Sequence, residues 1–442
     1  MFTFVCKVFK NKKKEYILLL LILTLLMSFE FCFLAMYNSF TYFDFDIYVA
    51  LSMNSIPSIS IFIAVILIVF VVKYFIDSKK QEFSILLLSG RKPKDLFVYL
   101  ILQFGFLSLI SFILGIGIGT CIMITIQYIV EFLSLSYSLT YNLSSVLFLY
   151  VCFLFISLTL ILAVASRQFV MLDTNLSSHL SHKASANLNT VPIKLSAKSK
   201  KKKLPIISIL ISLIVVYITV TQIIQMMDPS ISLYNLFISF SLSLFGIIFV
   251  INTIIPLLYD ILHDSFLVKH PILLQGLAQF NSFLKTLITL LNMNAYILPI
   301  LLFMLFFSDK NEIAQVILVP SFIMNVIMIV LCFVLRFSIY NRQHLSSLSL
   351  FHSLGYDSNK LFKISLVKNI IFGLFGILIP FLLLVQLFIK AVNEGYMNSQ
   401  LATLLIIFYI VVYLGLVIYI MIKERNSQKE VTDHVKYLNR GQ

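Results

Sequence analysis

Apolar runs of about 20 residues recur along the whole chain, separated by short polar segments. A run of that length crosses the roughly 30 Å hydrocarbon core of a bilayer as an α-helix. Sixty per cent of the 442 residues are apolar, only 12% are charged, and the mean hydropathy is +1.00. A globular chain of this length needs a mostly polar surface, so a soluble fold is excluded. We expect an all-α polytopic membrane protein.

The apolar runs predict ten membrane helices, and the charges between them set the topology. If the N-terminus is cytoplasmic, Lys310 and Lys390 are the only outer-loop residues among the 33 Lys and Arg. Positive loops remain on the cytoplasmic side, so both termini are expected inside. The ten ranges are 16–37, 57–76, 97–128, 144–165, 205–225, 231–259, 284–307, 315–339, 364–389 and 401–422.

The net charge of +14 does not indicate nucleic acid as a partner. Basic residues cluster at the ends of apolar runs, as topology signals do, and membrane lipids are the partners that this pattern indicates. The five cysteines stand singly without metal-like spacing, so we expect neither a disulfide framework nor a metal site.

Sequence motifs for chemistry were not found. There is no phosphate-binding loop, no H-E-x-x-H helix and no G-x-S-x-G elbow. We therefore expect no catalytic residue and no cofactor, and energy must come from a partner that binds ATP or from an ion gradient. The glycines of Gly115-Ile116-Gly117-Ile118-Gly119 lie in an apolar run, where close helix packing is their expected role.

Two similar segments follow the second and the eighth predicted spans. They align without a gap when Gly90 is paired with Gly355, which also pairs Phe83 with Leu348. In the first copy, apolar residues recur at i, i+3, i+4 and i+7, the period of one helix face. A glycine at the end of such a face suits a left-handed C-terminal cap. Each copy predicts a short cytoplasmic helix followed by a turn; an amphipathic helix lying on the inner membrane surface is the alternative.

The first copy resembles the signature of the FtsX-like (MacB-type) ABC transporter permease superfamily. Basic residues, Glu82 and Phe83, an apolar helix, Gly90, further basic residues and a glycine-containing span follow in that order. The second copy departs from the signature, because Ser347 stands where Glu82 does and Pro380 where Gly115 does.

Ten spans with two such modules resemble the BceB-type branch, whose members act in resistance to bacitracin and other antimicrobial peptides. That branch carries a large extracellular domain between its seventh and eighth spans, where this chain has only residues 308–314. The substrate sensing attributed to that domain is therefore not carried over.

The resemblance implies a permease subunit that is not itself an enzyme. A separate ABC ATPase would hydrolyse ATP, and the two cytoplasmic helices would dock on it and transmit its movement to the spans. Two modules in one chain imply one permease per ATPase dimer. The implied location is a bacterial cytoplasmic membrane. The implied cargo is an amphipathic peptide or lipid-linked compound, handled for resistance, immunity or export. The implied coupling residues are Glu82, Phe83, Leu86, Leu87, Gly90, Leu348, Phe351, His352 and Gly355.

Two other functions remain open at the level of the sequence. The chain could relay the state of an ABC ATPase to a sensor kinase or small membrane protein, or it could be a secondary carrier that uses Glu30 within the first span. Glu30 could equally be protonated or paired at a helix interface. Asn292, Asn294 and Asn325 could line a polar cavity or form interhelical hydrogen bonds.

The predicted organisation has five parts. They are a four-helix module at 1–165 with its coupling helix near 81–90, a polar cytoplasmic linker at 166–204, a two-helix insert with a cytoplasmic segment at 205–283, a second four-helix module at 284–422 with its coupling helix near 346–355, and a cytoplasmic tail at 423–442.

Overall fold

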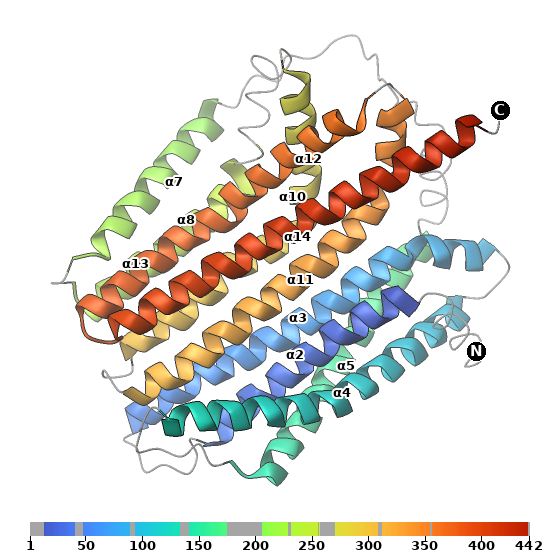
Figure 1. Ribbon diagram of the computed structural model, residues 1–442. Helices are drawn as coiled ribbons and strands as arrows, with labels where there is room; N and C mark the ends of the chain where they lie inside the picture. Colours follow the sequence, from blue (N-terminus) through green and yellow to red (C-terminus); the bar gives the residue numbers. More distant parts are fainter. Residues whose placement is uncertain are drawn as a thin grey trace. The chain divides into compact units, whose positions relative to one another are not determined.

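The computed structural model is helical wherever it describes regular structure, with no strand among the described residues (Figure 1). This confirms an all-α fold. The described residues are 13–39, 47–88, 93–132, 141–174, 206–228, 231–254, 256, 270–307, 312–353 and 356–440. Their elements are α2 (Lys13–Ser39), α3 (Ile47–Leu88), α4 (Pro93–Phe132), α5 (Leu143–Thr174), α7 (Ile206–Gln225), α8 (Leu233–Phe249), η2 (Val250–Ile254), α10 (Pro271–Phe303), η4 (Met304–Phe307), α11 (Glu312–Ser353), α12 (Ser358–Phe372), η5 (Gly373–Leu378), α13 (Ile379–Asn393) and α14 (Ser399–Arg440).

The described helices match the predicted spans closely. Nine of them are long and apolar enough to cross a membrane. The remaining predicted span, 205–225, corresponds to α7, whose apolar part is shorter at Leu210–Gln225. The chain is therefore a multi-pass membrane protein.

The repeat seen in the sequence recurs in the helix boundaries. Helices α3 and α11 each contain 42 residues, and both ends of α11 lie 265 positions after those of α3, the offset that pairs Gly90 with Gly355. By the same offset, α12 begins at the counterpart of the first residue of α4. The candidate spans within α3 and α11 end at Ile76 and Asn341, which are again counterparts.

Each coupling segment is the direct continuation of the span before it. Residues 77–88 of α3 and 342–353 of α11 extend beyond the candidate spans without a break in the helix. We call them the first and the second lever. Gly90 and Gly355, predicted to end these segments, lie outside the described residues, as does most of the predicted linker.

The chain divides into two compact units, which are described separately. The first contains α2, α3, α4, α5 and residues Val319–Ile339 of α11. Helix α2 packs against α3, α4 and α5. A Cβ atom built on Gly119 of α4 would lie 2.7 Å from the Phe31 ring and 3.0 Å from the Ser28 carbonyl oxygen of α2. Only glycine fits at that approach, which confirms the expected packing role for Gly119, whereas a Cβ atom on Gly117 would meet nothing within 4 Å.

The second unit contains α7, α8, α10, α12, α13, α14 and the two ends of α11, Glu312–Leu318 and Tyr340–Ser353. Helix α10 packs against α8, α12 and α13, while α14 packs against α12 and α13. The Phe240 and Phe303 rings stack between α8 and α10 at 4.2 Å. Helix α10 begins within the predicted insert, and α14 continues through most of the predicted tail.

Two spans of the second unit contain π-helical segments. Helix α8 continues into η2, and η5 stands between α12 and α13. A π-helical turn is rare, frequently marks a functional site and alters the hydrogen bonding of the backbone within a span.

Candidate functional site

The predicted coupling residues fall on the two levers. Glu82, Phe83, Leu86 and Leu87 lie in the first lever. Leu348, Phe351 and His352 lie at the corresponding stretch of the second lever. Because each lever continues a span, a force applied to it would act on that span directly.

Within the first unit, the spans of α3 and α11 contact each other at two positions along their length. The Asn325 amide nitrogen donates to the Ser60 hydroxyl at 3.0 Å and also to the Ser321 carbonyl oxygen at 2.8 Å. Closer to the levers, the Arg336 guanidinium lies over the Tyr74 ring at 4.5 Å from its centroid. Of the alternatives for Asn325, the structure places this side chain in an interhelical hydrogen bond.

Asn292 and Asn294 of α10 contact the two π-helical segments. The Asn292 amide nitrogen donates to the Asn252 oxygen of η2 at 3.1 Å. The Asn294 amide nitrogen donates to the Gly376 carbonyl oxygen of η5 at 3.4 Å, and its own oxygen accepts from the Tyr413 hydroxyl. Both side chains therefore join helices of the second unit.

Glu30 lies buried in α2, with only 1% of its surface exposed. Its Oε1 atom has no hydrogen-bond partner among the described residues. Burying an unpaired carboxylate is costly, so this position remains unusual for a structural residue. Glu30 and Asn325 belong to the first unit, whereas Asn292 and Asn294 belong to the second.

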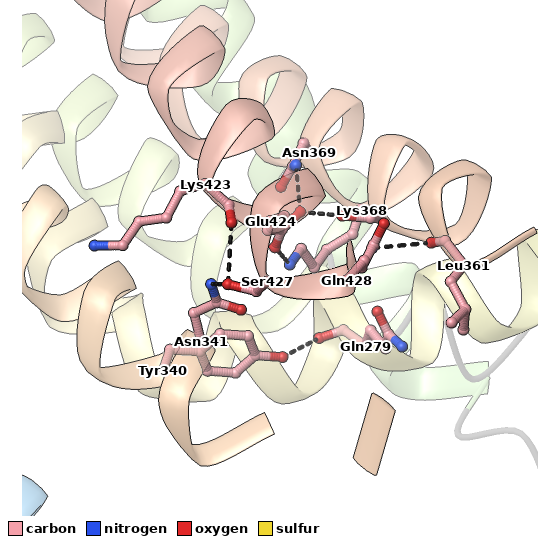
Figure 2. Close-up of polar contacts among 11 residues, drawn as sticks. Gln279, Tyr340, Asn341, Leu361, Lys368, Asn369, Lys423, Glu424, Ser427 and Gln428 are labelled. Carbon is pink, nitrogen blue, oxygen red and sulfur yellow. Dashed lines mark hydrogen bonds and ion pairs between the residues drawn. The ribbon is translucent and has the colours of Figure 1, made fainter. Parts of the chain in front are cut away.

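A polar cluster that sequence reasoning missed lies in the second unit (Figure 2). Glu424 of α14, 5% exposed, accepts hydrogen bonds from three residues of α12. Ser365 and Lys368 donate to it, as does Asn369 at 2.8 Å. Lys368, 3% exposed, forms an ion pair with the same carboxylate. We call these four residues the inner cluster.

Aromatic and amide contacts tie the inner cluster to α10 and α11. The Lys368 ammonium lies 5.2 Å from the centroid of the Phe283 ring of α10 and 5.3 Å from that of the Tyr340 ring of α11. The next residue of α11, Asn341, donates to the Ser427 hydroxyl of α14 at 2.8 Å (Figure 2). Four helices thus meet at one buried ion pair.

One feature of the sequence indicated this cluster. Lys368 stands inside the predicted span 364–389, and an ionisable residue within a span indicates function or a buried partner. Its partner could not be read from spacing, because Glu424 is far along the chain and just beyond the predicted last span.

One comparison with known proteins indicates a permease. The fold defines a multi-pass α-helical membrane protein. Residues 54–171 match the family model of the FtsX-like permease C-terminal domain, and they include the first lever. This match supports a place in the FtsX/MacB permease superfamily, whose members are generally non-enzymatic membrane components and typically pair with an ABC ATPase. Neither the curated proteins nor the solved structures gave a match.

Proposed function

We propose that the chain is the permease subunit of a mechanotransmission ABC transporter in a bacterial cytoplasmic membrane. A separate ABC ATPase binds the two levers, and ATP-driven dimerisation of that partner moves the spans that the levers continue. ATP hydrolysis occurs in the partner, and this chain converts it into movement of its spans.

The observation that carries this proposal is the matched pair of levers. Two helices of equal length leave the predicted membrane region at counterpart positions and continue for the same distance. The first of them lies within the matched FtsX-like region. Paired levers suit a partner that presents two equivalent surfaces, as a dimeric ATPase does. We therefore propose one permease per ATPase dimer.

The cargo follows from the resemblance to the BceB-type branch. We propose an amphipathic peptide or a lipid-linked compound, removed from the membrane or exported so that the cell is resistant or immune to it. Only residues 308–314 stand between the seventh and eighth spans, so recognition is assigned to the spans and their outer ends rather than to a large outer domain.

Purification of the full-length chain with its ATPase, followed by native mass measurement, tests this function. The partner is identified by a phosphate-loop sequence, and the expected complex holds one chain and two ATPase subunits. Equal numbers of the two subunits, or no ATPase, would contradict the proposal.

A substitution on the first lever tests the contact itself. Phe83, Leu86 and Leu87 share one face of α3, and Gln81 lies on the opposite face by helical periodicity. Leu86→Asp is expected to abolish ATPase association while the chain still inserts into the membrane. Gln81→Asp adds the same charge to the other face and is expected to retain association. Equal binding by the two variants would exclude docking through this face.

A further inference from the structure

The inner cluster lies where the second lever leaves the membrane. Lys368 and Glu424 each lie 25 residues from the outer end of their span, at Asn393 and Ser399. At 1.5 Å per residue, both lie about 37 Å from the outer side, just past a hydrocarbon core of about 30 Å. Tyr340 and Asn341, which contact the cluster and α14, are the last residues of the α11 span before the second lever.

A buried ion pair is poor evidence for added stability. Removing two charges from water costs about as much as their attraction returns, and apolar replacements are often as stable. Such a pair does fix the relative positions of the helices that carry it, because each buried charge is stable only with its hydrogen-bonding partners in place. Three donors surround the Glu424 carboxylate, and two aromatic rings flank the Lys368 ammonium. The cluster therefore specifies how α10, α11, α12 and α14 meet.

The two modules differ at the position of Lys368. By the 265-residue offset, the counterpart of Lys368 is Gln103, which is uncharged. Gln103 donates to the Tyr16 hydroxyl of α2. The two levers are alike in length and register, but the buried cation beside the second lever has an uncharged counterpart in the first module.

We infer that Lys368 and Glu424 are positioning residues that join the second lever to the last two spans. The inference rests on the proposed function of the levers. When the lever moves, Tyr340 and Asn341 move with it, and the ion pair makes α12 and α14 follow. The second module therefore transmits the movement driven by the ATPase through a block of helices joined by the ion pair, whereas Gln103, the counterpart of Lys368 in the first module, is uncharged.

Distances between spin labels in the full-length permease–ATPase complex test this coupling. Labelled non-canonical amino acids at Ser346 on the second lever and Asn426 on α14 avoid the native cysteines. The wild-type complex is expected to give a narrow distance distribution, because the junction holds the two sites together when nucleotide is added. Lys368→Met is expected to broaden it and to reduce ATP hydrolysis by the bound ATPase, with association retained. The reversed pair K368E/E424K is expected to restore a narrow distribution.

Gln103→Met, at the counterpart position, is the matched control and is expected to leave the Ser346–Asn426 distribution unchanged. A narrow distribution in Lys368→Met would overturn the inference and leave the proposed function intact. Should the wild-type chain bind no ATPase, the proposed function fails, and the label distances in the chain alone still decide whether the ion pair holds the lever. If Lys368→Met does not fold, the reversed pair decides: a broad distribution in that variant refutes the junction.

Discussion

Asn325 donates a hydrogen bond to Ser60, and these two residues are counterparts in the internal repeat, 265 positions apart. In a symmetric pair of helices, equivalent positions contact each other. The two copies of this repeated helix show the same arrangement. The contact was not used to find the repeat, which rests on the segments around Gly90 and Gly355. It therefore supports the repeat independently, at positions within the spans that lie far from the levers.

The Ser60–Asn325 hydrogen bond predicts a measurable coupling between the two positions. Ser60→Ala, Asn325→Ala and the double variant form a thermodynamic cycle. We expect a coupling free energy of about 0.6 kcal/mol, the average for interhelical hydrogen bonds in membranes. Reversible unfolding in mixed detergent micelles measures it. Purely additive effects of the two substitutions would show that the hydrogen bond contributes nothing to stability.

The close approach of α2 and α4 predicts opposite outcomes at two nearby glycines. Gly119→Leu places its side chain against Phe31 and Ser28 and should destabilise the protein by about 1–3 kcal/mol through overpacking. Gly117→Leu is the control, because a Cβ atom there meets nothing within 4 Å. Thermal denaturation in detergent should give a lower Tm for the first variant and an unchanged Tm for the second. A similar loss in both would mean that glycine is needed for another reason.

The π-helical segment η5 predicts a ranking of two substitutions. Its carbonyl oxygens at Gly376 and Ile377 accept hydrogen bonds from Asn294 and from the Tyr409 hydroxyl, the latter at 3.4 Å. Tyr409→Phe removes one hydroxyl, which donates to Ile377 and also bonds with Asn294 and Tyr413, and should cost about 1 kcal/mol. Asn294→Leu removes both the amide donor to Gly376 and the amide oxygen that accepts from Tyr413, so the cost should be roughly twice as large. Unfolding free energies measure both, and the reverse order would contradict this account of η5.

The sequence predicted the helical architecture well and the polar contacts poorly, for a physical reason. Apolar length and the repeat around Gly90 are local properties, so the spans and the matching ends of α3 and α11 followed from them. Whether Asn294 joins helices or lines a cavity depends on which helix lies beside it, and a single sequence does not encode that directly. The Lys368–Glu424 pair was missed for the same reason.

The unbroken helix through the first lever predicts that its coupling depends on rotational phase. Two alanines inserted between Ile76 and Asp77 lengthen α3 by about 3 Å and turn the lever by about 200°, so the face of Leu86 points away from the ATPase. Four alanines lengthen it by about 6 Å but turn it by only about 40°. A rigid lever should therefore bind the ATPase more weakly with two inserted residues than with four, although the second insertion is longer. Co-purification of the two variants measures this. Greater loss with four residues would indicate a length-limited flexible tether, and equal binding would indicate that the face of the lever is not read by the partner.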